Sequence, residues 1–400
     1  MAISVGTYLP PWGTDRGRVV GYDEDAVTLA VEAGRQALGS GSALRVVLVS
    51  RDLPLLEGGN SAALVAGLGL PVDTEVVERI GGAPAALDSI VTADPGTLVI
   101  AADVSGAAGA GAILVAEANS VHVVSRVQRS FPQRTRHGDG SVYIDDDPRM
   151  MRELGVRESM DAAALPGKPL IVAGLGAKDA AAWSEPGAPA LPTAGASSIV
   201  FALAALIEAG RSGLIAASEQ AALTAASVDV TGSTVSRKEP AAQPPAKRKL
   251  APGADIKLSL AAYDRAWEPK TRWEAGKCTK CGMLAMPPRF HCLGCGADDT
   301  WELTPLPRTA TVYTCSTIRV PVPNLESPYT LAVVECDGVD VRVLVHVTDV
   351  APGTAKIGDH GSLVFRRVAM RAGVPDYGHA FSPDSPGAAS TADAMSGGAR

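Results

Sequence analysis

The first 277 residues of this 400-residue chain contain no cysteine. This absence excludes a disulfide within that part of the chain, and it excludes a cysteine thiolate as a nucleophile there. Aromatic residues are also few, at 4% of the chain. Side chains that stack on the bases of single-stranded nucleic acid are therefore scarce.

Excess positive charge and long apolar runs are also missing. The formal net charge is -7, whereas a general nucleic-acid-binding protein needs a positive surface to neutralise phosphates. No segment approaches the ~18 consecutive apolar residues of a membrane-spanning helix. The start, MAISVGTYLPPWG, lacks the basic flank and apolar run of a secretory signal. We therefore expect a cytoplasmic protein with no membrane span.

Two stretches lack large apolar side chains and divide the chain. From about residue 228 the sequence reads SVDVTGSTVSRKEPAAQPPAKRKLAPGADI, which cannot bury enough apolar surface to offset the entropy of ordering. We predict a flexible linker at 229–256 and, by the same reasoning, a disordered tail at 382–400. The predicted folded parts are then 1–228 and 257–381.

The part before the linker alternates strand-like and helix-like runs. LRVVLVS (44–50) and TLVIAAD (97–103) are continuous apolar runs, typical of buried strands in an α/β sheet. SSIVFALAALIEAG (197–210) is apolar on most faces and predicts a buried helix. The carboxylates of Asp23, Glu24 and Asp25 favour a helix start. Residues 1–228 are predicted to form a layered α/β domain.

The period of the pattern changes after residue 306. TATVYTCSTIRV, YTLAVVEC, VDVRVLVHV and GSLVFRRVAM are runs rich in β-branched residues. Two of them are joined by Asp337-Gly338, a strong signal for a tight hairpin turn. Four or five such strands predict a small β-barrel of the OB type at 306–381.

Four of the six cysteines lie in KCTKCGMLAMPPRFHCLGCG, as two Cys-x-x-Cys pairs. They are Cys278, Cys281, Cys292 and Cys295. In a reducing compartment such a cluster is more often a metal site than a pair of disulfides. The four thiolates can converge on one tetrahedral ion, while Gly282 and Gly296 supply the backbone freedom to fold the chain back. Four protein ligands leave no open coordination position, so we predict a structural zinc site, with iron as the alternative.

The segment 257–305 is therefore predicted as a helical lead-in followed by a rubredoxin-like zinc ribbon. His291 is a neighbour of Cys292 but not an expected ligand, because the four cysteines already complete the shell. Cys315 and Cys336 lie within predicted strands, where they are expected as small buried hydrophobic side chains.

The sequence from Trp273 onward resembles a known family. The cysteine pairs, Pro287-Pro288-Arg289, Ala310-Thr311-Val312-Tyr313 and the late Phe365-Arg366-Arg367 are similar to the zinc-ribbon plus OB-fold proteins long catalogued as a domain of unknown function. The resemblance covers about 260–382. It implies a protein that accompanies thiolases, hydroxymethylglutaryl-CoA synthases or acyl-CoA aldolases.

The first 228 residues resemble the thiolase superfamily, closest to its hydroxymethylglutaryl-CoA synthase branch. The matching segments are Tyr8-Leu9-Pro10, 22–33, 60–63, 98–103 and 109–112. Members attack an acyl thioester with a cysteine at a helix N-terminus, where the helix dipole favours the thiolate. Here that stretch is 78–87, with Ile80 or Gly81 at the place of the nucleophile.

The other functional positions of the superfamily also differ. Its histidine corresponds to the loop 173–178, its asparagine lies near Pro192-Thr193, and its acidic residue lies near Arg51. Serines 50, 89 and 197 have no paired histidine nearby in the sequence to activate them. The second structural repeat is short as well, so the resemblance is to a truncated thiolase-like domain. We predict no catalytic residue in this chain.

Together these features predict a non-catalytic, zinc-binding subunit of an acyl-CoA-processing complex. Its expected partner is a Cys-bearing thiolase-like or aldolase subunit, with acyl-CoA at the shared interface and no nucleic acid. One alternative is an active acyltransferase with an unusual nucleophile. A second alternative is a module that binds single-stranded nucleic acid. The nearly equal numbers of basic and acidic residues in 257–381 argue against it.

One basic segment is left without an assigned role. RVQRSFPQRTRHGDG (126–140) carries Arg126, Arg129, Arg134 and Arg136 together with Phe131. It is either a solvated basic loop or a contact for CoA phosphates or for an acidic partner surface.

Overall fold

The computed structural model describes residues 3–115, 120–137, 141–145, 147–253, 259–321, 323, 325–371 and 373–384. The chain divides into two compact units, 1–245 and 246–400, which are described separately. Within the described ranges, no helix has both the length and the apolar character needed to cross a membrane. The predicted tail falls outside these ranges from residue 385 onward.

The first unit is built around a six-stranded mixed sheet. Its strands are β1 (Ile3–Tyr8), β4 (Arg45–Ser50), β5 (Glu75–Ile80), β6 (Thr97–Asp103), β7 (Gly109–Val115) and β14 (Thr234–Lys238). They lie in the order β14–β1–β7–β6–β4–β5. β4 runs parallel to β5 and β6, and β7 runs antiparallel to β1 and β6. β4, β6 and β7 are almost wholly buried, as continuous apolar runs require when both faces are covered.

A second, four-stranded sheet belongs to the same unit. Its strands are β8 (Val121–Gln128), β11 (Ile171–Ala173), β12 (Gly213–Glu219) and β13 (Ala222–Val228). The order is β11–β12–β13–β8, with β11 parallel to β12 and the other pairs antiparallel. Two short ribbons complete the strands: β2 (Gly13–Thr14) with β3 (Gly17–Arg18), and β9 (Arg134–Arg136) with β10 (Val142–Ile144).

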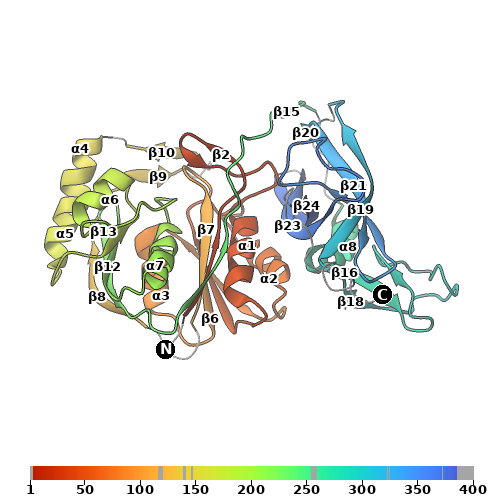
Figure 1. Cartoon of the computed structure of the whole chain (residues 1–400), viewed down its shortest axis with the longest axis horizontal. Helices are drawn as coiled ribbons and strands as arrows, with labels where there is room; N and C mark the ends of the chain where they lie inside the picture. Colours follow the sequence, from red (N-terminus) through yellow and green to blue (C-terminus); the bar gives the residue numbers. More distant parts are fainter. Residues whose placement is uncertain are drawn as a thin grey trace, which may run out of the picture. The chain divides into compact units, whose positions relative to one another are not determined.

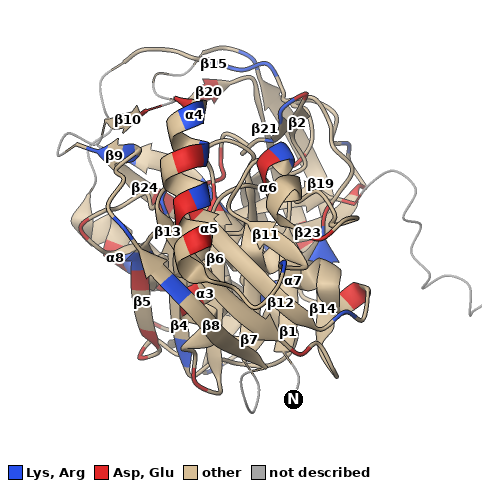
Figure 2. Cartoon of the chain, turned by 90° about the vertical axis from the view of Figure 1, so that its left-hand side faces the viewer, with Lys and Arg blue, Asp and Glu red and all other residues tan. Residues whose placement is uncertain are grey.

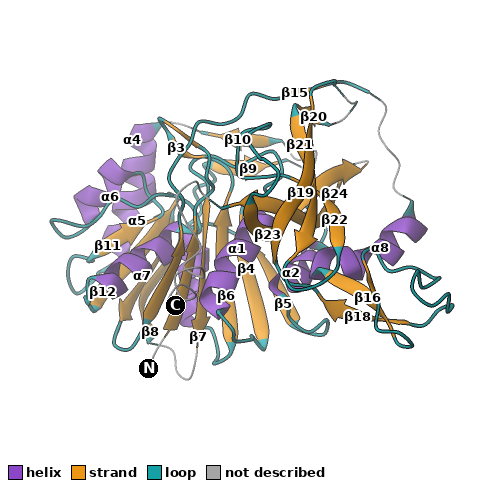
Figure 3. Ribbon diagram, turned by 45° about the vertical axis from the view of Figure 1, so that its right-hand side comes forward, coloured by secondary structure: helices purple, strands orange, loops and turns teal. Residues whose placement is uncertain are grey.

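Helices cover both faces of both sheets. They are α1 (Ala26–Leu38), α2 (Asn60–Leu68), α3 (Ala83–Val91), α4 (Pro148–Met150), the π-helix η1 (Met151–Arg157), α5 (Glu158–Ala163), α6 (Ala177–Trp183) and α7 (Ser198–Glu208). α1 packs on the six-stranded sheet, while α5 and α6 pack on the four-stranded one. α3 and α7 contact both sheets and lie between them (Figure 1), and α7 is labelled again in Figure 3. The prediction of a layered α/β domain is confirmed.

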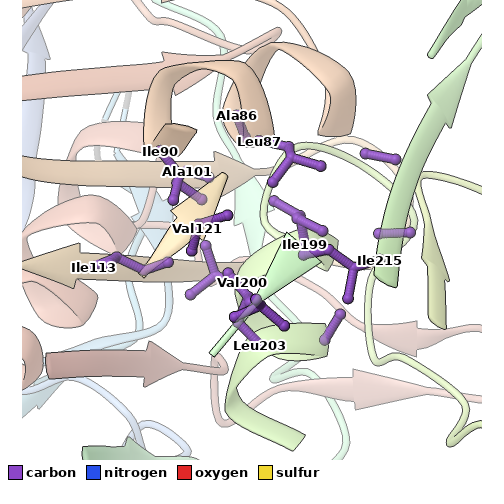
Figure 4. Close-up of a cluster of buried hydrophobic side chains, with 14 of the residues drawn as sticks. Ala86, Leu87, Ile90, Ala101, Ile113, Val121, Ile199, Val200, Leu203 and Ile215 are labelled. Atoms are coloured by element: carbon purple, nitrogen blue, oxygen red, sulfur yellow. The ribbon is translucent and has the colours of Figure 1, made fainter. Parts of the chain in front are cut away.

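The core of this unit lies between the two sheets. Leu87 and Ile90 of α3 and Ile199, Val200 and Leu203 of α7 are inaccessible to solvent. They pack between strands of the six-stranded sheet and β12 in one continuous cluster (Figure 4). Full burial of each such side chain contributes about 1.5–3 kcal/mol, so the two central helices hold the sheets together.

Two buried carboxylates accept hydrogen bonds from the backbone at the starts of helices in this unit. Asp25 is the N-cap of α1, as the acidic run at 23–25 predicts, and it accepts hydrogen bonds from the backbone of Val27 and Thr28. Asp103, at the end of β6, accepts from the backbone of Ala196 (2.7 Å) and Ser197 (2.8 Å). The Ser197 hydroxyl donates to it as well, at 2.6 Å. Asp103 thereby ties the start of α7 to the six-stranded sheet.

The expectation of a flexible linker at 229–256 is wrong for its first part. Residues 234–238 form β14, which pairs in parallel with β1 at the edge of the sheet. The strand has few apolar side chains, but its charged ones are paired: Arg237 with Glu208 and Glu239, and Lys238 with Glu32. An edge strand exposes one side to water and tolerates such a composition. Residues 254–256 lie outside the described ranges.

The second unit contains a five-stranded barrel. Its strands are β19 (Thr309–Ile318), β21 (Tyr329–Cys336), β22 (Arg342–His346), β23 (His360–Arg371) and β24 (Val374–Pro383), in the order β22–β21–β19–β23–β24. A bridge from Val347 to Phe381 joins the two ends of the sheet. Asp337-Gly338 lies between β21 and β22, with Gly338 at φ 73°, and confirms the predicted hairpin. β24 continues to Pro383, so the predicted tail is strand at its start.

A small ribbon precedes the barrel. It consists of β17 (Leu284–Ala285), β16 (Glu274–Cys278) and β18 (Trp301–Pro305), in that order across the sheet. The helix α8 (Leu260–Arg272) leads into it and packs on β16 and β24. β15 (Lys249–Leu250) pairs with β20 (Glu326–Ser327), so the predicted linker contains a second strand. The helical lead-in expected within 257–305 is confirmed.

We predict that Asp103→Ala destabilises the first unit by about 2–4 kcal/mol, because it leaves buried hydrogen-bond donors of Ala196 and Ser197 without an acceptor. The measurement is the free energy of unfolding in urea. Asp73→Ala, which removes an exposed carboxylate, is the control and should change it by less than ~0.5 kcal/mol. Equal effects of the two substitutions would contradict the role of Asp103.

Candidate functional site

The four clustered cysteines converge in the folded chain. Cys278 ends β16, Cys281 follows in the next turn, and Cys292 and Cys295 occupy a second turn before β18. The four sulfur atoms all lie within 4.8 Å of one another. The Sγ–Sγ distances are 3.8 Å for Cys278–Cys295 and 3.5 Å for Cys281–Cys292. A tetrahedron of ~2.3 Å metal–sulfur bonds has edges of about 3.8 Å, so the donor set fits one tetrahedral ion.

Both cysteine turns have the same backbone geometry. The amide of Gly282 donates to the carbonyl of Cys278 at 2.8 Å, and that of Gly296 donates to the carbonyl of Cys292 at 2.9 Å. Both glycines have positive φ, 77° and 69°, where a side chain would be strained. Each turn thus aims two sulfurs at one point, as the spacing predicts.

The surroundings favour the thiolate of Cys278 but not that of Cys281: a backbone hydrogen bond from Met283 lowers the pKa of the Cys281 thiol, but hydrogen bonds with the other cysteines raise this pKa overall to about 12. The hydroxyl of Thr300 lies 3.5 Å from Sγ of Cys278. This hydrogen bond, together with backbone amides of the turn, lowers the pKa of the Cys278 thiol to about 6. Four thiolates this close repel one another, and a divalent cation removes that repulsion. The cluster can therefore hold a metal ion, and its closed four-ligand shell suits a structural role.

The remaining sulfur and imidazole groups near this region lie outside the cluster. His291 is exposed and pairs through Nδ1 with Asp298. Cys336 is buried, and burial raises the pKa of its thiol to about 11. Cys315 is half-buried, less than predicted, and its thiol lies 3.5 Å from the carbonyl oxygen of Ala355.

The start of α3 is the second candidate site, because the thiolase resemblance places a nucleophile there. Ile80 ends β5 and is 62% exposed. Gly82 is the N-cap of α3 and has no side chain to cap the helix. None of these residues carries a nucleophilic group.

An ion pair covers this helix start. A guanidinium nitrogen of Arg51 lies 2.5 Å from Oε1 of Glu219, which ends β12. A methyl group built on Gly82 would lie 1.6 Å from Oε2 of Glu219 and 2.3 Å from the Arg51 guanidinium. The carboxylate thus lies against the positive end of the α3 dipole, which favours a negative charge. Sequence reasoning did not identify Glu219; the only sign of it is an acidic residue in the turn between two apolar strands.

The structure brings together three of the four positions that the resemblance assigns. Arg51 contacts the start of α3, as described. Gly174, in the loop 173–178, lies beside it: a methyl group built there would be 2.9 Å from Cβ of Ala83. Thr193, at the place of the asparagine, bonds instead to the hydroxyl of Ser197 at 2.8 Å.

The three serines considered as substitute nucleophiles have other hydrogen-bond partners. Ser50 accepts from the backbone of Asp52, Ser89 donates to the carbonyl of Ala85, and Ser197 donates to Asp103. His122 is exposed on β8, and His137 follows β9. The Ser227 hydroxyl donates to the backbone carbonyl of His122 at 3.5 Å, and not to the imidazole ring.

Comparisons with known proteins agree with the OB-fold barrel. The class that these features define is an OB-fold protein with a four-cysteine ribbon. A family model described as the C-terminal OB-fold domain of ChsH2 matches residues 303–366. A DUF35 domain-containing scaffold protein from Methanothermobacter thermautotrophicus is 31% identical over 111 residues, which are 27% of this chain and 83% of that protein. The chain belongs to the family of DUF35 domain-containing proteins.

Solved structures resemble each part of the chain. A structure named Ltp2-ChsH2(DUF35) aldolase is 24% identical, covering 34% of this chain and 98% of that one, with a TM-score of 0.26. The 3-oxoacyl-(acyl-carrier-protein) synthase III of Aquifex aeolicus is 15% identical over 57% of this chain and 99% of its own, with a TM-score of 0.46. OleA of Xanthomonas campestris is 14% identical over the same shares, with a TM-score of 0.47.

We predict that Cys278→Ser lowers the bound metal from about one ion per chain to near zero and unfolds the ribbon, because metal-binding energy is folding energy in such sites. Elemental analysis measures the metal, and limited proteolysis follows the ribbon. Cys315→Ser, which changes a cysteine outside the cluster, is the control and keeps the ion. Wild-type protein without zinc or iron would contradict the site.

We also predict that Arg51 and Glu219 are coupled by about 1–3 kcal/mol, because the pair is largely shielded from water. A double-mutant cycle of Arg51→Met and Glu219→Gln, followed by urea unfolding, measures the coupling. The exposed pair Arg211–Glu185 is the matched control, expected to give ~0–1 kcal/mol. A coupling no larger than in the control would show that Arg51 and Glu219 do not act as a unit.

Proposed function

We propose that this chain is a non-catalytic, zinc-binding subunit of an acyl-CoA thiolase, synthase or aldolase complex. It scaffolds a thiolase-like partner and helps to form the acyl-CoA channel of that partner. The observation that carries this proposal is the Arg51–Glu219 pair at the start of α3. An internal carboxylate lies against Gly82, next to Ile80 and Gly81, the positions to which the resemblance assigns the acyl-accepting thiolate.

The first unit supports this proposal by its layers as well as by its missing nucleophile. Two sheets enclose α3 and α7, and further helices cover the outer faces. This is the layer order that the thiolase resemblance implies. Covalent acyl transfer in that superfamily needs a thiolate, and the first 277 residues contain no cysteine. The reacting cysteine is therefore assigned to the partner.

The second unit supports the class of partner. The archaeal relative is named a scaffold protein, and one resembling structure is named an aldolase that contains a DUF35 chain. In a scaffold subunit of this kind, the four cysteines stabilise the ribbon by binding an ion, which we propose to be zinc. Zinc is preferred to iron because a closed shell of four cysteine thiolates is one of its common structural sites.

The test is to assay this chain alone and together with a Cys-bearing thiolase-like protein. Alone, it should neither turn over acetoacetyl-CoA nor gain mass on incubation with acetyl-CoA. With the partner it should co-purify, and removing it should lower the activity of the partner by about tenfold, an effect worth ~1.4 kcal/mol. Turnover by the chain alone, or a covalent acyl adduct before Ser227, would overturn the proposal.

A further inference from the structure

A groove of about 760 Å³ lies above the start of α3 in the first unit. Arg51, the 80–85 segment, the 129–137 segment and the turn 219–222 line it. Four of the lining residues are arginines and one is a glutamate. The groove is therefore basic in a chain whose net charge is -7. Figure 2 shows basic residues on β9, whose two arginines belong to this lining.

The four guanidinium groups are anchored at different points. Arg129 donates to the carbonyl of Leu154 at 2.9 Å and pairs with Glu158. Arg134 pairs with Asp52 at 3.3 Å. Each side chain is fixed before any ligand arrives, and each guanidinium has five N–H groups, more than these contacts use. Fixed donors lose little entropy when they bind an anion.

Arg136 is the least compensated of the four. Its guanidinium donates to the backbone carbonyl of Arg51. Within the described ranges it has no carboxylate partner. Gly82, Pro84 and Ala85 at the start of α3 line the same groove, where the Glu219 carboxylate already faces the positive end of the helix.

Apolar side chains lie between these charges. Ile80 is 62% exposed and Leu56 is 45% exposed, and both line the groove with Phe131 and Pro132. Large apolar side chains exposed beside charges are typical of protein interfaces. The four arginines come from three segments, after β4, after β8 and in β9, and three of them already have one carboxylate partner. A segment that carries both carboxylates and large apolar side chains matches this mixed lining better than a small anion does.

We infer that this groove is the docking site for an acidic segment of the partner subunit, one that carries several Asp or Glu residues and at least one large apolar side chain. This inference rests on the proposed function and names the chemistry of the partner surface. Complementary charge speeds association and fixes register, while the apolar contacts on Ile80 and Leu56 add hydrophobic burial.

The first experiment uses a fluorescein-labelled peptide of about twelve residues that alternates Asp and Glu with Leu and Phe. Its matched control replaces each acid by Asn or Gln. Fluorescence anisotropy with the full chain at about 50 mM salt should show binding of the acidic peptide only. Raising the salt to about 300 mM should weaken binding by about tenfold, because charge screening increases.

The variants are Arg136→Ala and the double change Arg129→Glu with Arg136→Glu. Arg136→Ala should weaken peptide binding about threefold, and the double variant more than about tenfold. Arg157→Glu reverses an exposed arginine that pairs with Glu153 and lies outside the groove lining, so it should leave binding unchanged. If the double variant does not fold, Arg136→Ala and the salt dependence decide the test.

Three results would overturn the inference. One is no binding of the acidic peptide at low salt, or equal binding of the neutral peptide. Another is that Arg157→Glu and Arg136→Ala weaken binding of the acidic peptide equally. A third is tight binding of pyrophosphate that excludes the peptide, which would make the groove a small-anion site. If groove variants that fold still assemble with the partner, the docking site is refuted but the proposed function is not. Turnover by the isolated chain refutes the proposed function.

Discussion

The contact between the Glu219 carboxylate and the start of α3 is the interaction on which the first unit depends most. The start of α3 has no side-chain cap, so the positive end of this helix depends on a negative charge from elsewhere in the fold. Glu219 supplies the negative charge, and Arg51 balances it at 2.5 Å. A buried charge without a partner is strongly destabilising. Each charge of the pair therefore offsets the cost of burying the other. The same contact fills the space beside Gly82.

Two glycines make this arrangement sterically feasible. At Gly82 a methyl group would overlap the Glu219 carboxylate, and at Gly174 it would lie 2.3 Å from the carbonyl oxygen of Ser218. Gly174 also has a φ of 86°, in the region that favours glycine. The loop that the resemblance assigns to a histidine is therefore too close to its neighbours for any side chain at this position. Close packing at these two glycines thus brings the two sheets together at the start of α3.

The parts of the fold that follow from local patterns could be predicted from the sequence. The cysteine spacing placed four sulfurs on one point because each pair sits in a single tight turn. The buried strands β4 and β6 could be recognised because continuous apolar runs need cover on both faces. β14 could not, since an edge strand with paired charges has the composition of a linker. The Arg51–Glu219 pair could not be foreseen either, because 168 positions separate two residues whose contact depends on the packing of both sheets.

The two units keep their shape by different means, and this difference bears on what the chain can do. The first unit is held by apolar helices between sheets, with Asp103 and Glu219 engaged at helix starts. The ribbon of the second is too small to bury a core of its own and depends on its four sulfurs for order. The carboxylates of Asp103 and Glu219 face helix starts, and the four cysteine sulfurs converge on one point. The first unit also carries a groove lined by arginines and exposed apolar side chains, a composition that suits recognition of a protein.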